Sequence, residues 1–74
     1  MYELKYEQTT DRWHAIPKGG GRDYALHCGD MLTIQIEDQH YLCRLELDSD
    51  WYVIIGKTRF RLYWKEIYQV LRLL

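Results

Sequence analysis

Histidine, cysteine and serine, the residue types of nucleophilic catalytic sets, are few in this sequence, and their spacing does not assemble such a set. The chain has three histidines and two cysteines, together with a single serine, Ser49. That serine lies between Asp48 and Asp50, in a segment whose composition is typical of a solvated turn. We therefore predict that the protein is not an enzyme.

Two histidine and cysteine pairs could in principle bind zinc. Strand residues an odd number of positions apart point to opposite faces, so His27 and Cys28 would diverge, as would His40 and Cys43. The sequence also lacks the paired Cys-x-x-Cys knuckles of structural zinc sites. We expect no metal and no other cofactor, with Cys43 in the core and the histidines at its rim.

Three consecutive glycines, at positions 19–21, lie between Lys18 and Arg22. Backbone amides in glycine loops can bind phosphate. However, no Lys-Ser or Lys-Thr pair completes a phosphate-loop motif, and no helix is predicted after the loop. A flexible hairpin loop is the favoured interpretation. The alternative is that Lys18 and Arg22 contact a partner or a nucleotide.

The elements that would position these residues are strands, because apolar and polar residues alternate over residues 26–63. Two-residue turns are predicted at Asp38-Gln39 and Gly56-Lys57, with a three-residue loop at 48–50. The first turn would pair Ile36 with Tyr41 and Ile34 with Cys43. The three registers place one apolar set on the inner face: Leu32, Ile34, Cys43, Leu45, Trp51, Val53, Phe60 and Leu62.

The same registers predict what the outer face carries. Tyr52 would lie between Glu46 and Arg61, and Ile54 between Arg44 and Arg59. We call Arg44, Tyr52, Ile54, Arg59 and Arg61 the arginine face. Because tyrosine and arginine are enriched at binding hot spots, this face is the predicted partner site.

Two alternatives remain open for the arginine face. It could be an ordinary solvated surface with a Glu46–Arg61 ion pair. It could also be covered by a first strand, residues 2–7, through Tyr2, Leu4 and Tyr6.

The remaining segments complete an all-β prediction. A second strand, residues 12–16, is ended by Pro17, which lacks an amide donor. After Tyr63, either a helix or a short 3₁₀ turn at 64–67 followed by a strand at 68–73 fits, and strand propensity favours the second. About five to six short antiparallel strands would curl into a small barrel. With 74 residues, we expect one domain spanning residues 1–74.

Charge and hydropathy argue against three classes of protein: general nucleic-acid binders, secreted proteins and membrane proteins. The net charge of −1 and the pI near 6.3 argue against a general nucleic-acid binder. No signal peptide is visible, and no apolar run approaches the roughly 20 residues that span a bilayer. We therefore expect a cytoplasmic protein without a membrane partner, whose cysteines are reduced.

Two segments carry a resemblance to SH3-like barrels. The segment 26–34, Leu-His-Cys-Gly-Asp-Met-Leu-Thr-Ile, resembles their diverging turn, and Arg44 after Tyr41 resembles their aromatic-x-x-Arg third strand. This resemblance implies an SH3-like barrel. The chain lacks the Ala-Leu-Tyr-Asp-Tyr-like and Pro-x-x-Tyr segments that bind proline-rich peptides, so that activity is not expected.

Residues 12–62 also resemble an uncharacterised family of Gram-positive bacteria, their phages and conjugative elements. The shared features are an Arg-Trp strand, the Leu-His-Cys-Gly-Asp segment, Arg-Leu-Glu at 44–46 and Asp-Trp-Tyr at 50–52. The resemblance implies an accessory protein of a mobile element.

We therefore expect a non-catalytic binding protein, most concretely a counter-defence inhibitor that engages a host protein. One alternative is a nucleotide-binding sponge or, less favoured on charge grounds, a nucleic-acid-binding SH3-like module. Another is a structural or assembly protein whose edge strands pair between subunits, for which a homodimer is one open form.

Overall fold

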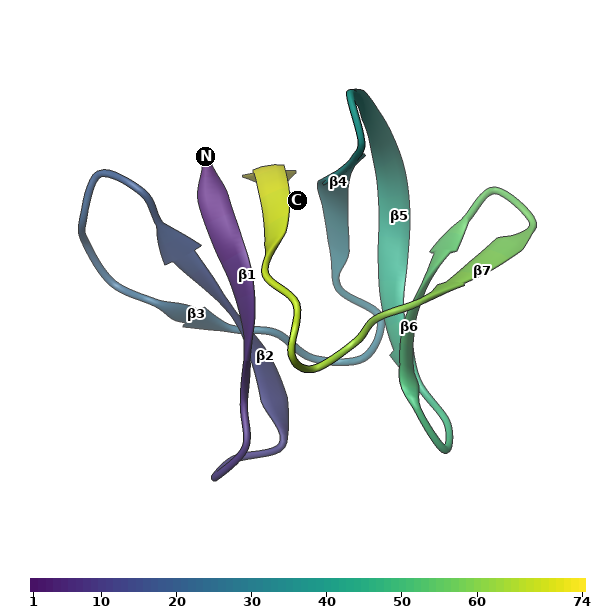
Figure 1. The fold of residues 1–74 in the computed structure, drawn as a ribbon, viewed down its shortest axis with the longest axis horizontal. Helices are drawn as coiled ribbons and strands as arrows, with labels where there is room; N and C mark the ends of the chain where they lie inside the picture. The colour runs from purple at the N-terminus through teal and green to yellow at the C-terminus, as the bar shows by residue number, and fades with distance from the viewer.

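The computed structural model describes residues 1–74 and contains eight strands and no helix (Figure 1). The strands are β1 (Tyr2–Glu7), β2 (Arg12–Pro17), β3 (Tyr24–Ala25), β4 (Met31–Ile36), β5 (Gln39–Leu47), β6 (Trp51–Ile55), β7 (Thr58–Arg61) and β8 (Tyr68–Leu73). The all-β prediction is confirmed, and the alternative of a C-terminal helix is wrong.

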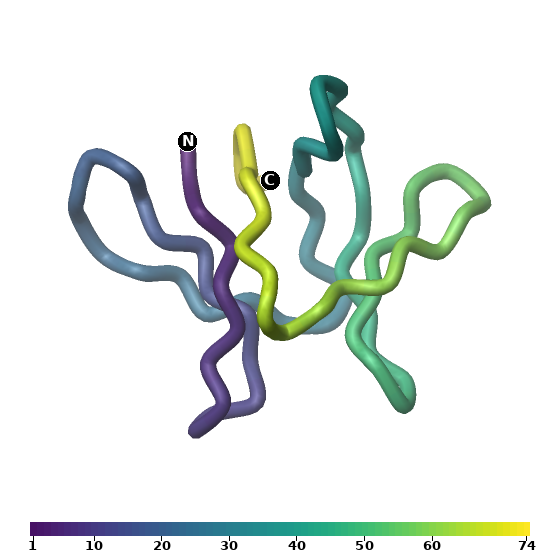
Figure 2. Tube along the Cα trace, viewed as in Figure 1, coloured from purple at the N-terminus to yellow at the C-terminus, as the bar shows by residue number.

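The strands form one antiparallel sheet in the order β3-β2-β1-β8-β4-β5-β6-β7. The C-terminal strand β8 lies between β1 and β4, so the two ends of the chain run side by side (Figure 2). It joins the N-terminal hairpin to the four strands of residues 31–61. Every pair of neighbours along this order is antiparallel.

The sheet is open, so the prediction of a closed barrel of five to six strands is wrong. Its two edges, β3 and β7, lie on opposite sides of the fold and do not pair (Figure 1). The edge β3 is only two residues long. A strand this short offers too few backbone groups to close a barrel against β7.

The sheet buries one face, and this face is the one that the alternation predicted. Seven of the eight predicted inner residues are buried, and the eighth, Phe60, packs against them. The N-terminal hairpin adds Leu4, Trp13 and Ala15, all fully buried. The alternation of β1 and β2 thus extends the same apolar face across the whole sheet.

Two of the three predicted registers are confirmed. Leu47 pairs with Trp51 across the 48–50 loop, and Val53 pairs with Phe60 across the Gly56-Lys57 turn. In the β4–β5 hairpin the predicted register is wrong by two residues, because Ile34 pairs with Tyr41 and not with Cys43.

The reason for the shifted register is that the β4–β5 turn occupies Glu37-Asp38, one position earlier than predicted. Glu37 adopts the left-handed conformation with φ 56°. The common two-residue hairpin turns, types I′ and II′, require such a positive φ at their first residue. A shift of two residues leaves every side chain on the same face, so the inner face survives the error.

The last strand has the predicted bounds, but the segment before it is a β-turn and not a 3₁₀ helix. The Glu66 N–H donates to the Tyr63 carbonyl at 2.9 Å, which closes a single turn. Between Thr33 and Ile34 the β4–β8 register shifts at a bulge. Val70 is fully buried and pairs with both Tyr2 and Ile34.

Two leucines on β5, Leu42 and Leu45, test the assignment of faces. Leu45 is 0% exposed, whereas Leu42 is 55% exposed on the opposite face. We expect Leu45→Ala to lower the free energy of unfolding by about 2–5 kcal/mol through the cavity it leaves. Leu42→Ala, the matched control, is expected to change it by less than about 0.5 kcal/mol. Urea unfolding measures both, and equal losses would contradict the assignment.

Candidate functional site

The arginine face forms as the sequence predicts. Tyr52 pairs with Glu46 on β5 and Arg61 on β7, and Ile54 pairs with Arg44 and Arg59. The N-terminal strand does not cover this face. Leu4 is buried in the core, and Tyr2 and Tyr6 pack against that core, so the alternative of a covered face is wrong.

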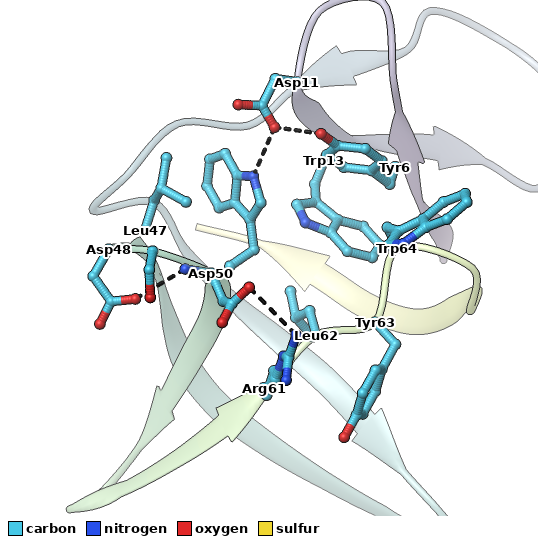
Figure 3. Close-up of a pocket in the computed structure, with 12 residues that line it drawn as sticks. Tyr6, Asp11, Trp13, Leu47, Asp48, Asp50, Arg61, Leu62, Tyr63 and Trp64 are labelled. Atoms are coloured by element: carbon cyan, nitrogen blue, oxygen red, sulfur yellow. Dashed lines mark hydrogen bonds and ion pairs between the residues drawn. The ribbon is translucent and has the colours of Figure 1, made fainter.

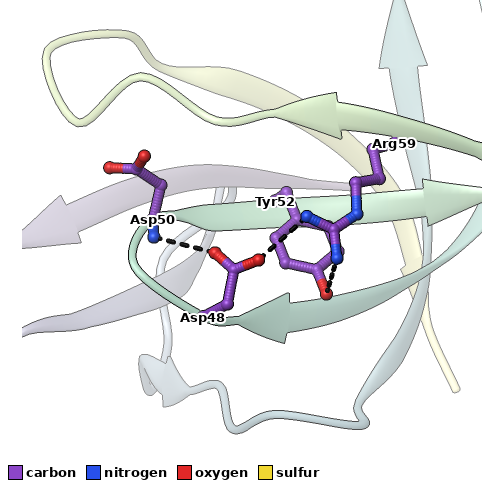
Figure 4. Close-up of polar contacts among 4 residues, drawn as sticks. All are labelled: Asp48, Asp50, Tyr52 and Arg59. Carbon is purple, nitrogen blue, oxygen red and sulfur yellow. Dashed lines mark hydrogen bonds and ion pairs between the residues drawn. The ribbon is translucent and has the colours of Figure 1, made fainter.

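Arg59 is held against its own chain (Figure 4). One guanidinium nitrogen donates to Asp48 Oδ2 at 2.8 Å, and another donates to the Tyr52 hydroxyl at 3.2 Å. The guanidinium carbon lies 4.1 Å from the centre of the Tyr52 ring, within cation–π range. The Asp50 backbone N–H and Arg59 hold the pKa of Asp48 below its usual value. The hydrogen bond to Asp48 raises the pKa of Arg59.

The other two arginines of the face also have carboxylate partners. Arg44 Nε donates to Glu46 at 2.6 Å, and Arg61 donates to Asp50 at 3.3 Å. The expected Glu46–Arg61 pair is therefore replaced by two separate pairs. Because the face is exposed to solvent, these ion pairs are weak and can exchange for a partner's groups.

The structure does not bring Lys18 and Arg22 to the arginine face. Both are exposed in the loop that joins β2 to β3, at the end of the sheet opposite to β7. Gly20 and Gly21 in this loop have φ of 91° and 115°, a region that favours glycine. The glycines are thus explained by the conformation of the loop.

A groove that the sequence did not predict lies beside the arginine face (Figure 3). It has a volume of about 400 Å³. All three tryptophans of the protein line it, one each from β2, β6 and the segment before β8. We call it the tryptophan groove, and its lining is Tyr6, Asp11, Trp13, Leu47, Asp48, Ser49, Asp50, Trp51, Arg61, Leu62, Tyr63 and Trp64.

Asp11 ties the two sides of the tryptophan groove together. Its Oδ1 accepts hydrogen bonds from the Tyr6 hydroxyl and from Trp51 Nε1, the latter at 3.3 Å (Figure 3). Asp11 has φ 53°, a left-handed conformation that aspartate tolerates better than most residues. The hydrogen bond from Tyr6, and to a smaller extent that from Trp51, lowers the pKa of the Asp11 carboxyl. The Tyr6–Asp11 bond also raises the pKa of Tyr6.

The groove combines a buried wall with an accessible rim. Trp13 is 0% exposed, and its Nε1 has no hydrogen-bond partner within the protein. Tyr63 and Trp64 are 56% and 52% exposed. Arg61 belongs both to the groove and to the arginine face, so the two features form one continuous surface. Such a surface can bind through aromatic contacts and charge-assisted hydrogen bonds.

The family model of a domain of unknown function, DUF5348, matches residues 2–71. The chain belongs to the DUF5348 family. No curated protein and no solved structure matches it. The resemblance to an uncharacterised family, predicted for residues 12–62, therefore extends over nearly the whole sheet. The structure contains no helix that is both long and apolar enough to cross a membrane.

The two cysteines of this DUF5348 member lie in different environments. Cys43 is in the core, as predicted, and burial raises the pKa of its thiol to about 11. Cys28 is exposed, and neither cysteine forms a disulfide. Three or more His, Cys, Asp or Glu side chains do not come together anywhere in a way that could hold a metal ion.

The lowered pKa of Asp11 makes the joint between the groove walls sensitive to acid. Its carboxylate stabilises the fold fully above its unfolded pKa of about 3.9, and this contribution is lost as the pH falls through the lower, folded pKa. We expect Asp11→Asn to lower the melting temperature at pH 7 and to reduce its fall between about pH 5 and pH 2.5. Thermal unfolding followed by circular dichroism measures both.

Glu7 and Asp48 also have lowered pKa values, so some acid sensitivity is expected to remain in the variant. Identical pH profiles for the wild type and Asp11→Asn would show that the Asp11 bonds do not stabilise the fold.

Proposed function

We propose that this protein is a non-catalytic binding protein whose tryptophan groove engages a partner protein. One observation carries the proposal: the fold gathers all three tryptophans and Arg61 around a single open groove. Tryptophan, tyrosine and arginine are the residue types that dominate binding energy at protein interfaces. The arginine face, which shares Arg61, supplies the adjoining polar rim.

The exposed rim supports a protein as the occupant. Tyr63, Trp64 and Leu47 are all large apolar side chains left open to solvent around the groove. Contiguous apolar surface rimmed by charge is typical of protein interaction sites. Asp48, Asp50 and Arg61 provide that charged rim. The arrangement thus combines a buried aromatic wall with side chains that a partner can reach.

The concrete form of this proposal is a counter-defence inhibitor, encoded by a phage or mobile element, that engages a host protein. The small single sheet and the resemblance to mobile-element proteins support this form. The neighbours of its gene provide a direct check, and counter-defence or transfer genes beside it would support this form.

The proposal is tested by capturing a partner from a Gram-positive host lysate with purified protein and a photo-crosslinker at Tyr63. We expect Trp64→Ala to abolish the crosslink, because it removes an accessible anchor of the groove. Leu42→Ala is the matched control, since Leu42 is exposed to a similar degree but does not line the groove, and it is expected to retain the crosslink. Absence of any specific crosslink, or equal capture by both variants, would contradict the proposal.

A nucleotide is the second candidate ligand, because Arg61 lies among aromatic rings in the groove. Arginine binds phosphate and aromatic rings stack on bases. Against this, the groove also carries Asp11, Asp48 and Asp50, whose charges repel phosphate. The nucleotide sponge, and with it the nucleic-acid module, is therefore less well supported than a protein partner.

Thermal shift against cyclic and linear nucleotides separates the two candidates. A nucleotide that binds the folded state raises the melting temperature by mass action. We expect no shift with any nucleotide at about 1 mM, a concentration at which ligands with a Kd near 10 μM stabilise by roughly 2.7 kcal/mol. A shift that Arg61→Gln removes would favour the nucleotide sponge instead.

A further inference from the structure

The edge strand β7 has only one neighbour, and half of its backbone polar groups are unpaired. The Leu62 N–H donates to the Trp51 carbonyl at 3.0 Å. Backbone groups alternate in direction along a strand, so the N–H and C=O groups of Thr58 and Phe60, four and two residues earlier, also point toward β6. The N–H and C=O groups of Arg59 and Arg61 consequently point away from the sheet. They form a template to which another strand can add.

The outer side of this edge keeps a small excess of positive charge, because it carries Arg59, Arg61 and Lys57 and only the two arginines are paired, with Asp48 and Asp50. Each guanidinium has five N–H donors, of which Arg59 uses two and Arg61 uses one within the protein. Lys57, in the adjoining turn, is exposed as well. Unused donors therefore remain along the edge for the carboxylates of a partner.

The inner side of the same edge is apolar. An opening of about 300 Å³ lies next to β7, on the face of the sheet where Phe60 packs against the core. Its lining is Ile36, Tyr41, Ile55, Thr58 and Phe60. A ninth strand beside β7 would direct every second side chain toward this opening.

A second copy of the chain is a poor occupant. Antiparallel pairing of two β7 strands would bring the arginines of one copy beside those of the other. Like charges on facing strands are destabilising, and charged side chains are a common means of preventing such pairing. Charge complementarity instead favours a strand whose outward residues are acidic.

We propose that β7 accepts an added strand from a partner protein, in which acidic residues alternate with apolar residues. The acidic residues lie beside Arg59 and Arg61, and the apolar residues cover the opening next to Phe60. This inference rests on the proposed function, since it describes how part of a protein partner is bound. Main-chain hydrogen bonds supply the affinity, and the alternation supplies the specificity.

Amide hydrogen exchange by NMR tests the proposal with defined peptides. The probes are the blocked hexapeptides (Glu-Val)₃ and (Lys-Val)₃. We expect saturating (Glu-Val)₃ to slow exchange of the Arg59 and Arg61 amides by at least about tenfold, because a protected amide exchanges only when the added strand leaves. The Phe60 amide, already directed at β6, is expected to change little. (Lys-Val)₃ is expected to protect neither arginine.

Two variants at Arg59 separate backbone pairing from charge. Arg59→Val keeps the outward N–H and loses the charge, so we expect weaker protection at Arg61. Arg59→Pro also removes the outward N–H without breaking a bond to β6, and is expected to abolish protection. If the proline variant does not fold, the valine variant and the two peptides still decide the question.

Each other outcome overturns strand addition. Equal protection by both peptides would show that charge does not select the strand. If the Arg59 and Arg61 amides are protected without any peptide, and this protection rises with protein concentration, a second copy of the chain occupies the β7 edge. Absence of protection by either peptide would reject the edge as a docking site. In that last case, a crosslink lost in Trp64→Ala would still support the proposed function, so the two failures are distinguishable.

Discussion

The whole sheet depends on the pairing of β8 with its two neighbours. On one side β8 pairs with β1, through contacts such as Tyr2 with Val70, and on the other it pairs with β4. Without it, the molecule would separate into an N-terminal hairpin and a four-stranded meander. Each piece would expose an apolar face that only the complete sheet buries. The fully buried Val70, which pairs with both neighbours, is the centre of this joint.

The tryptophan groove is a consequence of that joint. Its walls come from the β1–β2 hairpin, from the start of β6 and from the segment that leads into β8. These three parts meet only when β8 has brought the two halves of the sheet together. The Asp11 carboxylate then fastens the hairpin to Trp51. The aromatic surface is therefore as dependent on the global fold as the core is.

Alternation predicted the faces of the sheet because side chains in a strand have a period of two. It could not fix the β4–β5 register, since a shift of two residues leaves the faces unchanged. That register depends on Glu37 adopting a left-handed conformation, which glutamate rarely does. The arginine face was predictable for the opposite reason, because the Gly56-Lys57 turn leaves only one reasonable pairing of β6 with β7.

The tryptophan groove was not predictable from local pattern. Trp64 lies in a segment without alternation. Alternation places Trp51 in the core, which is correct, but it does not indicate that one side of Trp51 also lines the groove. Asp11 and Trp51, whose Nε1–H donates to the Asp11 carboxylate, are 40 residues apart in sequence. Only the spatial order of the strands, with β8 inserted between β1 and β4, brings these residues together.

The position of β8 also sets the order of events as the protein is made. Leu4 pairs with Tyr68, so the first strand must wait for the synthesis of residues 68–73 before its second neighbour exists. At typical translation rates this wait is roughly 3–13 s, during which only the local hairpins can form. The sheet therefore assembles after translation of its last strand. Until then, the nascent chain has neither a complete core nor a groove with which to recognise a partner.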